Sequence, residues 1–173
     1  MNYFFEWLMT GTVSSNVNNN PLDFLEEIVV DNSWPHNRVN ENTLYVEIGG
    51  QGCDFFLSLA WSQDSNLLQY TFTYNMKIRN DSYDSLCNLI NIINRQLCFG
   101  HFELWMEDGW IIFRNSIFAK NEKDSLQDQI SQIFSLSISE CEKYYPAFQF
   151  LLFENKSPKD AIAASMINTL GEA

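Results

Sequence analysis

Histidine, basic residues and paired cysteines are scarce in this chain, and each shortage excludes a class of function. The 173 residues include two histidines, His36 and His101, and four cysteines that form no CxxC pair. A structural zinc site usually needs four ligands at such spacing, so the sequence predicts no metal centre, and no motif in it requires another cofactor. Ten lysines and arginines stand against 22 acidic residues, a formal charge of -12. That charge repels phosphate groups, so nucleic acid is not an expected partner.

Long apolar runs are missing too. No stretch approaches the ~20 uncharged apolar residues that span a bilayer as a helix. The N-terminal run "MNYFFEWLM" is interrupted by Glu6 and has no basic leader, so it does not indicate secretion. Cysteines scattered through apolar runs behave as small hydrophobes with reduced thiols. We therefore expect a cytoplasmic protein that does not associate with a membrane.

What the chain has in quantity is apolar and aromatic surface. Hydrophobic residues make up 46% of the sequence and aromatic residues 15%, enough to bury a full core in one domain. Residues 10–20, "TGTVSSNVNNN", are small and polar with no period, as is typical of a linker. The sequence therefore predicts an N-terminal appendage and Asn-rich linker over residues 1–20 and a single domain over residues 21–173.

Hydrophobic spacing divides that domain into helices and strands. Apolar residues at steps of three and four predict helices that begin at residues 21, 82, 126 and 158. Strict alternation predicts three strands over residues 44–48, 55–61 and 68–76, and a hairpin over residues 101–119. Pro146 lies inside the third helix and cannot donate to the carbonyl four residues earlier, so we expect that helix to bend or break there.

The order of these elements, α-β-β-β-α-β-β-α-α, indicates an α+β fold. We expect a five-stranded antiparallel sheet, made of a three-strand meander and a hairpin, with the helices packed on it. The segments "PLDFLEEIV", "GHFELWMEDGWIIFR", "CEKYYPAFQFLLFENKSPKDAIAA" and "TLGEA" carry a family likeness. Through them, residues 21–173 resemble the YbjN-type family of bacterial sensory transduction regulators. The resemblance implies a fold similar to that of the small acidic homodimeric chaperones of type III secretion, and it brings no catalytic residue to this chain.

Trp105 is the side chain most typical of a binding anchor. On an alternating strand it lies opposite in phase to Phe102 and Leu104, so if those two face the core then Trp105 faces outward. Glu103 and Glu107 are expected on the same outward side, as a polar rim of the kind that surrounds an interface anchor. Two interpretations stay open: a protein interface, or a tryptophan covered by other parts of the chain.

A second aromatic group consists of Tyr144, Tyr145 and Phe148, which flank Pro146. Their spacing follows a helical stripe, and such a stripe usually packs into a core. If a cavity lies between the bent helix and the sheet, these three side chains would line it. They are therefore candidate binding residues for a ligand in such a cavity.

No set of residues converges on a catalytic arrangement. Cys98 and His101 lie close in sequence, but a histidine without an orienting carboxylate or a placed nucleophile is a weak base candidate. The "GGQG" stretch at residues 49–52 lacks the lysine of a phosphate loop and leads into a strand, so it predicts a turn. We therefore expect no enzyme. An enzyme that uses Cys98 and His101 is the least favoured alternative.

Two functional hypotheses remain. The first is a non-enzymatic regulator or chaperone-like adaptor that forms a homodimer and binds another protein, because the surface is acidic, aromatic residues are plentiful and catalytic sets are missing. The alternative is a small-molecule sensor with an aromatic cavity between the bent C-terminal helix and the sheet.

Overall fold

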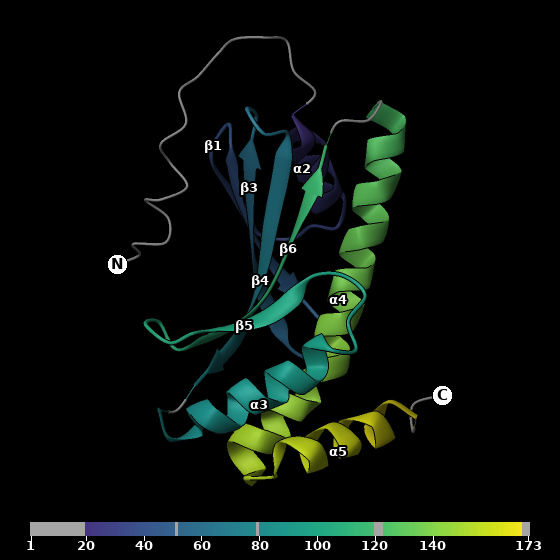
Figure 1. The fold of residues 1–173 in the computed structure, drawn as a ribbon. Coiled ribbons are helices and arrows are strands. Elements are labelled where there is room, and N and C mark those ends of the chain that lie inside the picture. Colours follow the sequence, from purple (N-terminus) through teal and green to yellow (C-terminus); the bar gives the residue numbers. More distant parts are fainter. Residues whose placement is uncertain (1–19, 51, 79, 120–122, 171–173) are drawn as a thin grey trace.

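The fold is built on one antiparallel sheet (Figure 1). The computed structural model describes residues 20–50, 52–78, 80–119 and 123–170. Six strands lie in the order β1-β2-β3-β4-β6-β5. They are β1 (His36–Asn40), β2 (Thr43–Gly49), β3 (Asp54–Ser62), β4 (Leu67–Lys77), β5 (His101–Trp105) and β6 (Trp110–Phe118). The first four form a meander, whereas β6 pairs with β4 and carries β5 at the edge.

Four α-helices accompany the sheet in the described residues, and the first and last of them begin at the capping residues that the sequence predicts. They are α2 (Pro21–Asp31), α3 (Tyr83–Asn94), α4 (Lys123–Glu154) and α5 (Pro158–Leu170), with a short 3-10 turn, η1 (Asn80–Ser82), before α3. Oδ1 of Asn20 accepts a hydrogen bond from the amide of Leu22 at 3.0 Å. At α5, the hydroxyl of Ser157 accepts one from the amide of Asp160 at 3.3 Å. Both caps satisfy amides that have no partner within the helix.

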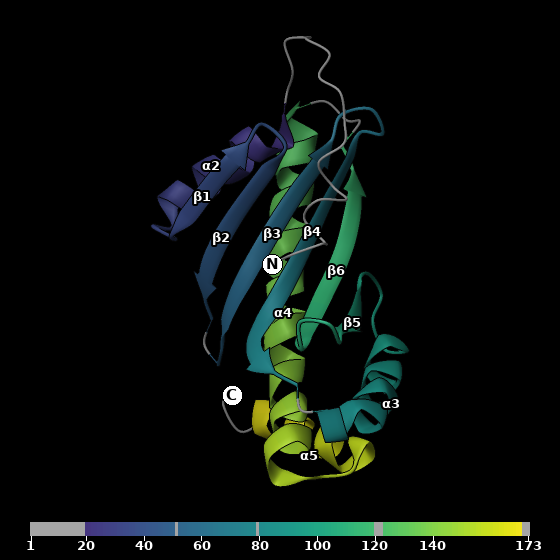
Figure 2. The same ribbon diagram turned by 90° about the vertical axis from the view of Figure 1, so that its left-hand side faces the viewer.

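Helices α2 and α4 cover one side of the sheet, which we call the inner face. Figure 2 shows α4 behind the middle of the sheet and α2 behind β1 and β2. Successive side chains of a strand point to opposite sides, so every second residue is buried against these helices. The buried strand residues of this face include Leu44, Val46, Ile48, Phe55, Leu57, Leu59, Tyr70, Phe72, Tyr74 and Phe113.

Aromatic rings form the centre of this core. The ring centroid of Phe148 on α4 lies 5.5 Å from that of Tyr74 and 5.5 Å from that of Phe102. Tyr144, one turn earlier, meets Phe102 edge-on at 6.0 Å. The hydroxyl of Tyr74 donates a hydrogen bond to the carbonyl of Cys141 at 2.6 Å. Rings and a buried hydrogen bond therefore hold α4 against the sheet.

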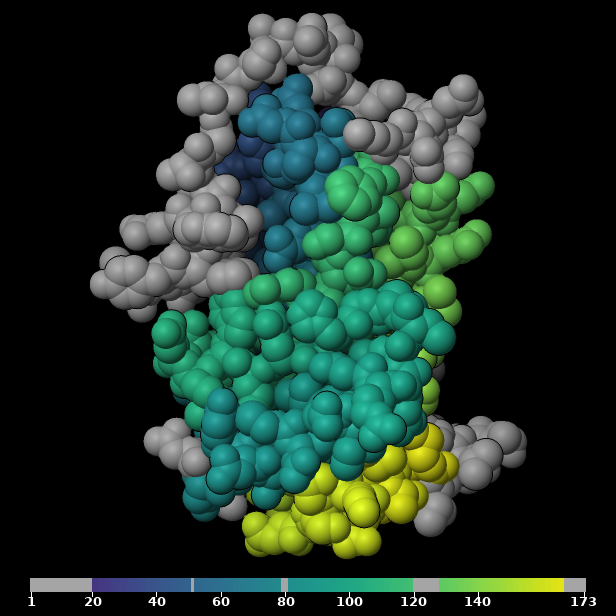
Figure 3. Space-filling model, in the orientation of Figure 1, coloured from purple at the N-terminus to yellow at the C-terminus, as the bar shows by residue number. Residues whose placement is uncertain are grey.

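The remaining helices close one end of the molecule. Helix α3 packs against β5, α4 and α5, and α5 packs along α4. In the space-filling view of Figure 3, the surface of the β5–β6 region lies directly above α3 and α5. This end therefore holds the β5–β6 hairpin in place from below.

The prediction of five strands is wrong, because β1 forms a sixth. Its sequence, "HNRVN", has one aliphatic residue, Val39, and that side chain is 44% exposed. With a single aliphatic residue, this segment has no apolar alternation to detect. The strand forms through pairing with β2 and through Arg38, whose guanidinium lies 3.1 Å from Asp23 and 3.4 Å from Glu26 on α2.

Helix α4 passes through Pro146 without a break. It is one helix of 32 residues, so the long helix is confirmed and a break at the proline is not found. The proline removes one backbone hydrogen bond. Tyr144 and Phe148, on either side of it, are fully buried. We attribute the continuity to their packing against the sheet, which offsets the missing bond.

Candidate functional site

The side of the sheet turned away from α2 and α4, which we call the outer face, carries a pocket of about 500 Å³. The strand residues at its base alternate in phase with the core residues of the inner face. They are Tyr45 and Glu47 of β2, Phe56 and Ser58 of β3, Thr71 and Thr73 of β4, and Ile112 of β6. Phe56 is 41% exposed although it is a large apolar side chain. We call this cavity the outer-face pocket.

The hairpin of β5 and β6 forms one wall of the outer-face pocket. Trp105, the last residue of β5, pairs with Trp110, the first of β6, and both line the pocket together with Asp108 in the turn. In Figure 1 the tip of this hairpin projects to the left, away from α4. Near the β1 edge the lining residues are Pro35, His36 and Asn37. The pocket therefore spans the sheet from one edge to the other.

A charged cluster lies beside the tryptophan wall. Nη2 of Arg114 is 3.0 Å from Oε1 of Glu103, and the guanidinium carbon is 5.3 Å from the centroid of the Trp105 ring. Nε2 of His101 lies 3.9 Å from Oε2 of Glu103. A guanidinium over an indole is attracted by the ring quadrupole, and the carboxylate holds that guanidinium in place. The cluster therefore orients Trp105 at the pocket.

The outward phase of Trp105 agrees with the alternation, but the expected position of Glu107 is wrong. Strand β5 ends at Trp105, so Glu107 lies in the turn, where it is exposed and no longer alternates with Glu103. The turn reverses the chain within four residues and includes Gly109 at a φ of 71°. Of the two predicted rim carboxylates, Glu103 alone lies on the strand.

The second predicted aromatic set lies on the other side of the sheet. Tyr144 and Phe148 have no exposed surface and belong to the inner core. The Tyr145 ring is half-buried, 5.5 Å from that of Tyr74, and burial raises its pKa. None of the three lines the outer-face pocket. The structure therefore separates Trp105 from these residues by the full thickness of the sheet.

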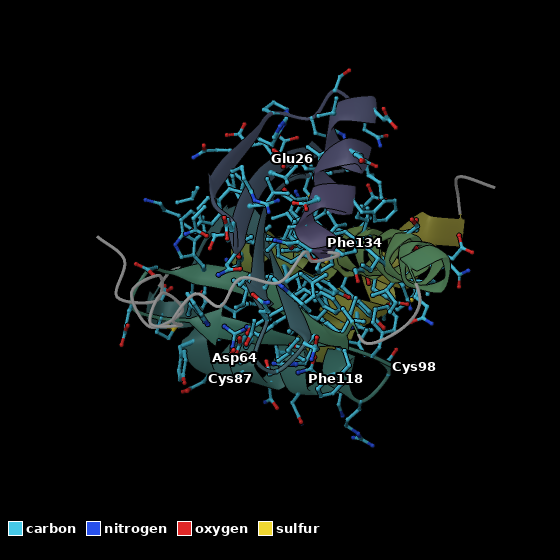
Figure 4. The ribbon with its side chains drawn as sticks, turned by 90° about the horizontal axis from the view of Figure 1, so that it is seen from above. Glu26, Asp64, Cys87, Cys98, Phe118 and Phe134 are labelled. Atoms are coloured by element: carbon cyan, nitrogen blue, oxygen red, sulfur yellow. The ribbon has the colours of Figure 1, made fainter. Side chains whose placement is uncertain are left out.

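Cys98 and His101, the pair considered as a possible enzyme site, do not line the outer-face pocket. Cys98 is an exposed free cysteine, and Figure 4 places it at the periphery of the molecule. His101 faces the carboxylate of Glu103. Within the described residues, no three histidine, cysteine or acidic side chains gather as metal ligands, and no helix is long and apolar enough to cross a membrane.

Of the residues that line the pocket, sequence reasoning named Trp105 as a binding residue and missed the other aromatic ones: Tyr45, Phe56 and Trp110. Each lies on a strand whose alternate residues pack into the core. Because side chains alternate between the two faces, the sequence could have shown that these three residues point to the outer face. The phenol of Tyr45 is neutral at physiological pH, as in any tyrosine, and burial raises its pKa further. The pocket is thus a largely uncharged aromatic surface, with carboxylates at Glu47 and Asp108.

Comparison with known proteins assigns a family to this fold. The YbjN family model, described as "Putative bacterial sensory transduction regulator", matches residues 21–150. The chain belongs to the YbjN family. The crystal structure of "YbjN, a putative transcription regulator from E. coli" is similar, with 14% identity and a TM-score of 0.51 over 73% of this chain and 88% of that chain. No curated protein matches the sequence.

Membership in the YbjN family supports some of the expectations from the sequence and leaves others as predictions. At 14% identity the likeness to the E. coli structure shows the α+β fold alone. The family description is that of a regulator and not of an enzyme. The similarity to type III secretion chaperones rests on the sequence resemblance alone, and the division into residues 1–20 and 21–173 stays a prediction.

Proposed function

We propose that this YbjN-family protein is a non-enzymatic regulator that binds a segment of another protein in the outer-face pocket. The observation that carries the proposal is the pocket of about 500 Å³ in which Trp105, Trp110, Tyr45 and Phe56 meet. Tryptophan and tyrosine dominate the binding energy of protein interfaces because they bury a large area at a small entropic cost. Arg114 and Glu103 fix the Trp105 side chain before a partner binds, so less conformational entropy is lost on binding.

The charges around the pocket favour a partner of particular chemistry. Glu47 and Asp108 lie at the pocket, and the whole chain has a formal charge of -12. Opposite charge steers association and like charge opposes it. We therefore propose a partner segment that inserts aromatic or aliphatic side chains and carries lysine or arginine beside them.

Selection from a random peptide library tests this function. The full chain is immobilised, bound peptides are sequenced, and a selected peptide is titrated by fluorescence polarisation. We expect peptides with aromatic anchors flanked by basic residues. Trp110→Ala should weaken binding at least about tenfold, as the loss of a buried interface tryptophan does, and raised salt should weaken it further.

The matched control is Phe118→Ala. Phe118 is 67% exposed at the end of β6 and does not line the pocket, so this variant should bind like the unmodified chain. If no peptide is enriched, or if Trp110→Ala and Phe118→Ala bind alike, the pocket is not a peptide site. The proposal would then be abandoned.

A small-molecule sensor is the second candidate function, and the volume of the outer-face pocket favours it. The cavity of about 500 Å³ falls in the range of about 300–1,000 Å³ that is usual for small-molecule sites. It lies on the opposite side of the sheet from the cavity expected beside Tyr144 and Phe148. A library of uncharged aromatic compounds, screened by thermal shift with Trp110→Ala as control, tests this alternative.

A further inference from the structure

We propose that the N-terminal segment of this chain, residues 1–9 with the sequence "MNYFFEWLM", binds in the outer-face pocket of its own molecule. The inference rests on the proposed function, because it names the resident occupant of that same pocket and so its regulation. A partner segment would then have to displace residues 1–9 before it could bind. The segment itself lies outside the described residues, and the argument uses its sequence and its attachment point.

The chemistry of the segment matches the chemistry of the pocket. Seven of its nine residues are apolar or aromatic, among them Phe4, Phe5 and Trp7. Such a run next to a polar linker is costly to leave in water and binds readily to an apolar surface. The outer-face pocket offers aromatic side chains from four strands, with Trp105 and Trp110 as its wall. An aromatic segment and an aromatic pocket are therefore present in one molecule.

The linker is long enough to bring the two together. Asn20 is anchored at the turn between β1 and β2, where its Nδ2 donates to the carbonyl of Glu41 at 2.6 Å. From that turn β2 leads directly to Tyr45 and Glu47 at the pocket, about 7 to 13 Å along the strand at ~3.3 Å per residue. Because α2 lies behind the sheet (Figure 2), the linker must also pass around the sheet, about 10 Å more.

The ten residues of the linker, 10–19, cover this span. A flexible chain of that length has a root-mean-square extension of about 17 Å, and its fully extended length is about 33 Å. A tether whose length matches the distance gives its ligand an effective concentration on the order of 1 mM. A segment with a dissociation constant of about 100 μM would then fill most pockets and weaken a competitor about tenfold.

The charge of the segment opposes its binding to the pocket only weakly. Glu6 is the one side chain in residues 1–9 that is charged at neutral pH. The segment therefore meets little repulsion from Glu47 and Asp108 at the pocket. A partner with basic flanks would have the electrostatic advantage over it. Displacement by such a partner follows from the same charges.

The test uses the full chain and a fluorescein-labelled synthetic peptide of residues 1–9. One variant carries Phe4→Ser, Phe5→Ser and Trp7→Ser, which removes the apolar anchors and leaves the pocket intact. The matched control carries Asn16→Ser, Asn18→Ser and Asn19→Ser in the linker. We expect the peptide to bind the anchor variant at least about tenfold more tightly than either the unmodified chain or the linker control. Adding Trp110→Ala to the anchor variant should reverse the gain.

A second measurement reports the pocket directly. The indole N–H resonances of Trp105 and Trp110 in a nitrogen–proton correlation spectrum should differ between the unmodified chain and the anchor variant. The resonance of Trp61, which is buried on the inner face, should stay in place. Coincident spectra would show that residues 1–9 do not contact the pocket.

The outcomes separate this inference from the proposed function. If the peptide binds the unmodified chain and the anchor variant equally, the inference fails while the pocket remains a peptide site. Should it bind neither, the inference fails, and the peptide-library selection decides the proposed function by itself. If the gain appears but light scattering shows a dimer that the anchor variant loses, the segment occupies a neighbouring copy, and occupancy within one molecule is wrong.

Discussion

Cys53, between β2 and β3, shows how burial sets the behaviour of a single residue in this protein. Burial, and then the nearby carboxylates of Glu142 and Asp54, raises the pKa of its thiol to about 12. An unfolded cysteine has a pKa of about 8.5. The folded protein therefore keeps this proton in a pH range where the unfolded chain has already released it.

The resulting prediction concerns alkaline stability. Because the unfolded state binds fewer protons than the folded state between pH ~8.5 and 12, the free energy of unfolding should fall as pH rises through that range. The stabilising contribution is fully present at neutral pH. Denaturant titrations at pH 7.5 and pH 10 measure the fall, and Cys53→Ala should make it smaller.

The control for this prediction is Cys98→Ala. Cys98 is an exposed free cysteine, so this variant removes a thiol and leaves Cys53 in place, and the fall attributed to Cys53 should persist. Equal pH dependence in the unmodified chain and in Cys53→Ala would contradict the assignment of the shift to this thiol.

At the scale of the element, helix α4 depends on the rings of its inner side. Phe148 has no exposed surface and packs on Tyr74 and Phe102. Phe153, five residues later on the same helix, is 67% exposed. Phe134, labelled in Figure 4, lies on the same helix, and its ring centroid is 4.8 Å from that of Tyr70. The helix therefore presents one ring after another to the sheet.

This arrangement predicts a large difference between two similar substitutions. Phe148→Ala should lower the free energy of unfolding by about 3–5 kcal/mol, because it leaves a cavity among packed rings. Phe153→Ala should change it by no more than about 0.5 kcal/mol, since that ring is in water. Urea denaturation followed by circular dichroism measures both. Similar losses in the two variants would show that α4 does not pack on the sheet as described.

At the scale of the whole molecule, the expected homodimer is a prediction about mass. The resemblance to homodimeric chaperones motivates it, and the exposed rings of Phe118 and Phe153 offer apolar surface outside the outer-face pocket. Light scattering at micromolar concentration should give the mass of two 20.2 kDa chains. A mass of one chain at every concentration tested would contradict the predicted homodimer. Trp105→Ala, measured alongside, reports whether the tryptophan wall takes part.

The net charge acts at this same scale. With a formal charge of -12, the protein should repel nucleic acid and stay soluble, and long-range attraction should speed its encounter with basic partners. Charge of this kind affects association and leaves the fold unchanged, because packing of the rings decides the core. The same reasoning ties the proposed partner to lysine and arginine.

The sequence by itself determined the periodic elements and their phases. Helix and strand spacing, the caps at Asn20 and Ser157, and the outward phase of Trp105 all follow from patterns within one segment. Such patterns are local, and each residue's burial repeats with the geometry of its own element. The edge strand β1 was not predicted, because its sequence has one aliphatic residue and therefore no such pattern.

Only the tertiary structure decided where the outer-face pocket lies. Alternation says that Tyr45, Phe56 and Trp105 avoid the core, but it does not say that they meet. They meet because β6 returns to pair with β4, which places the β5–β6 hairpin on the same sheet as β2 and β3. Strand order depends on contacts between residues far apart in the chain, and no local period encodes those contacts.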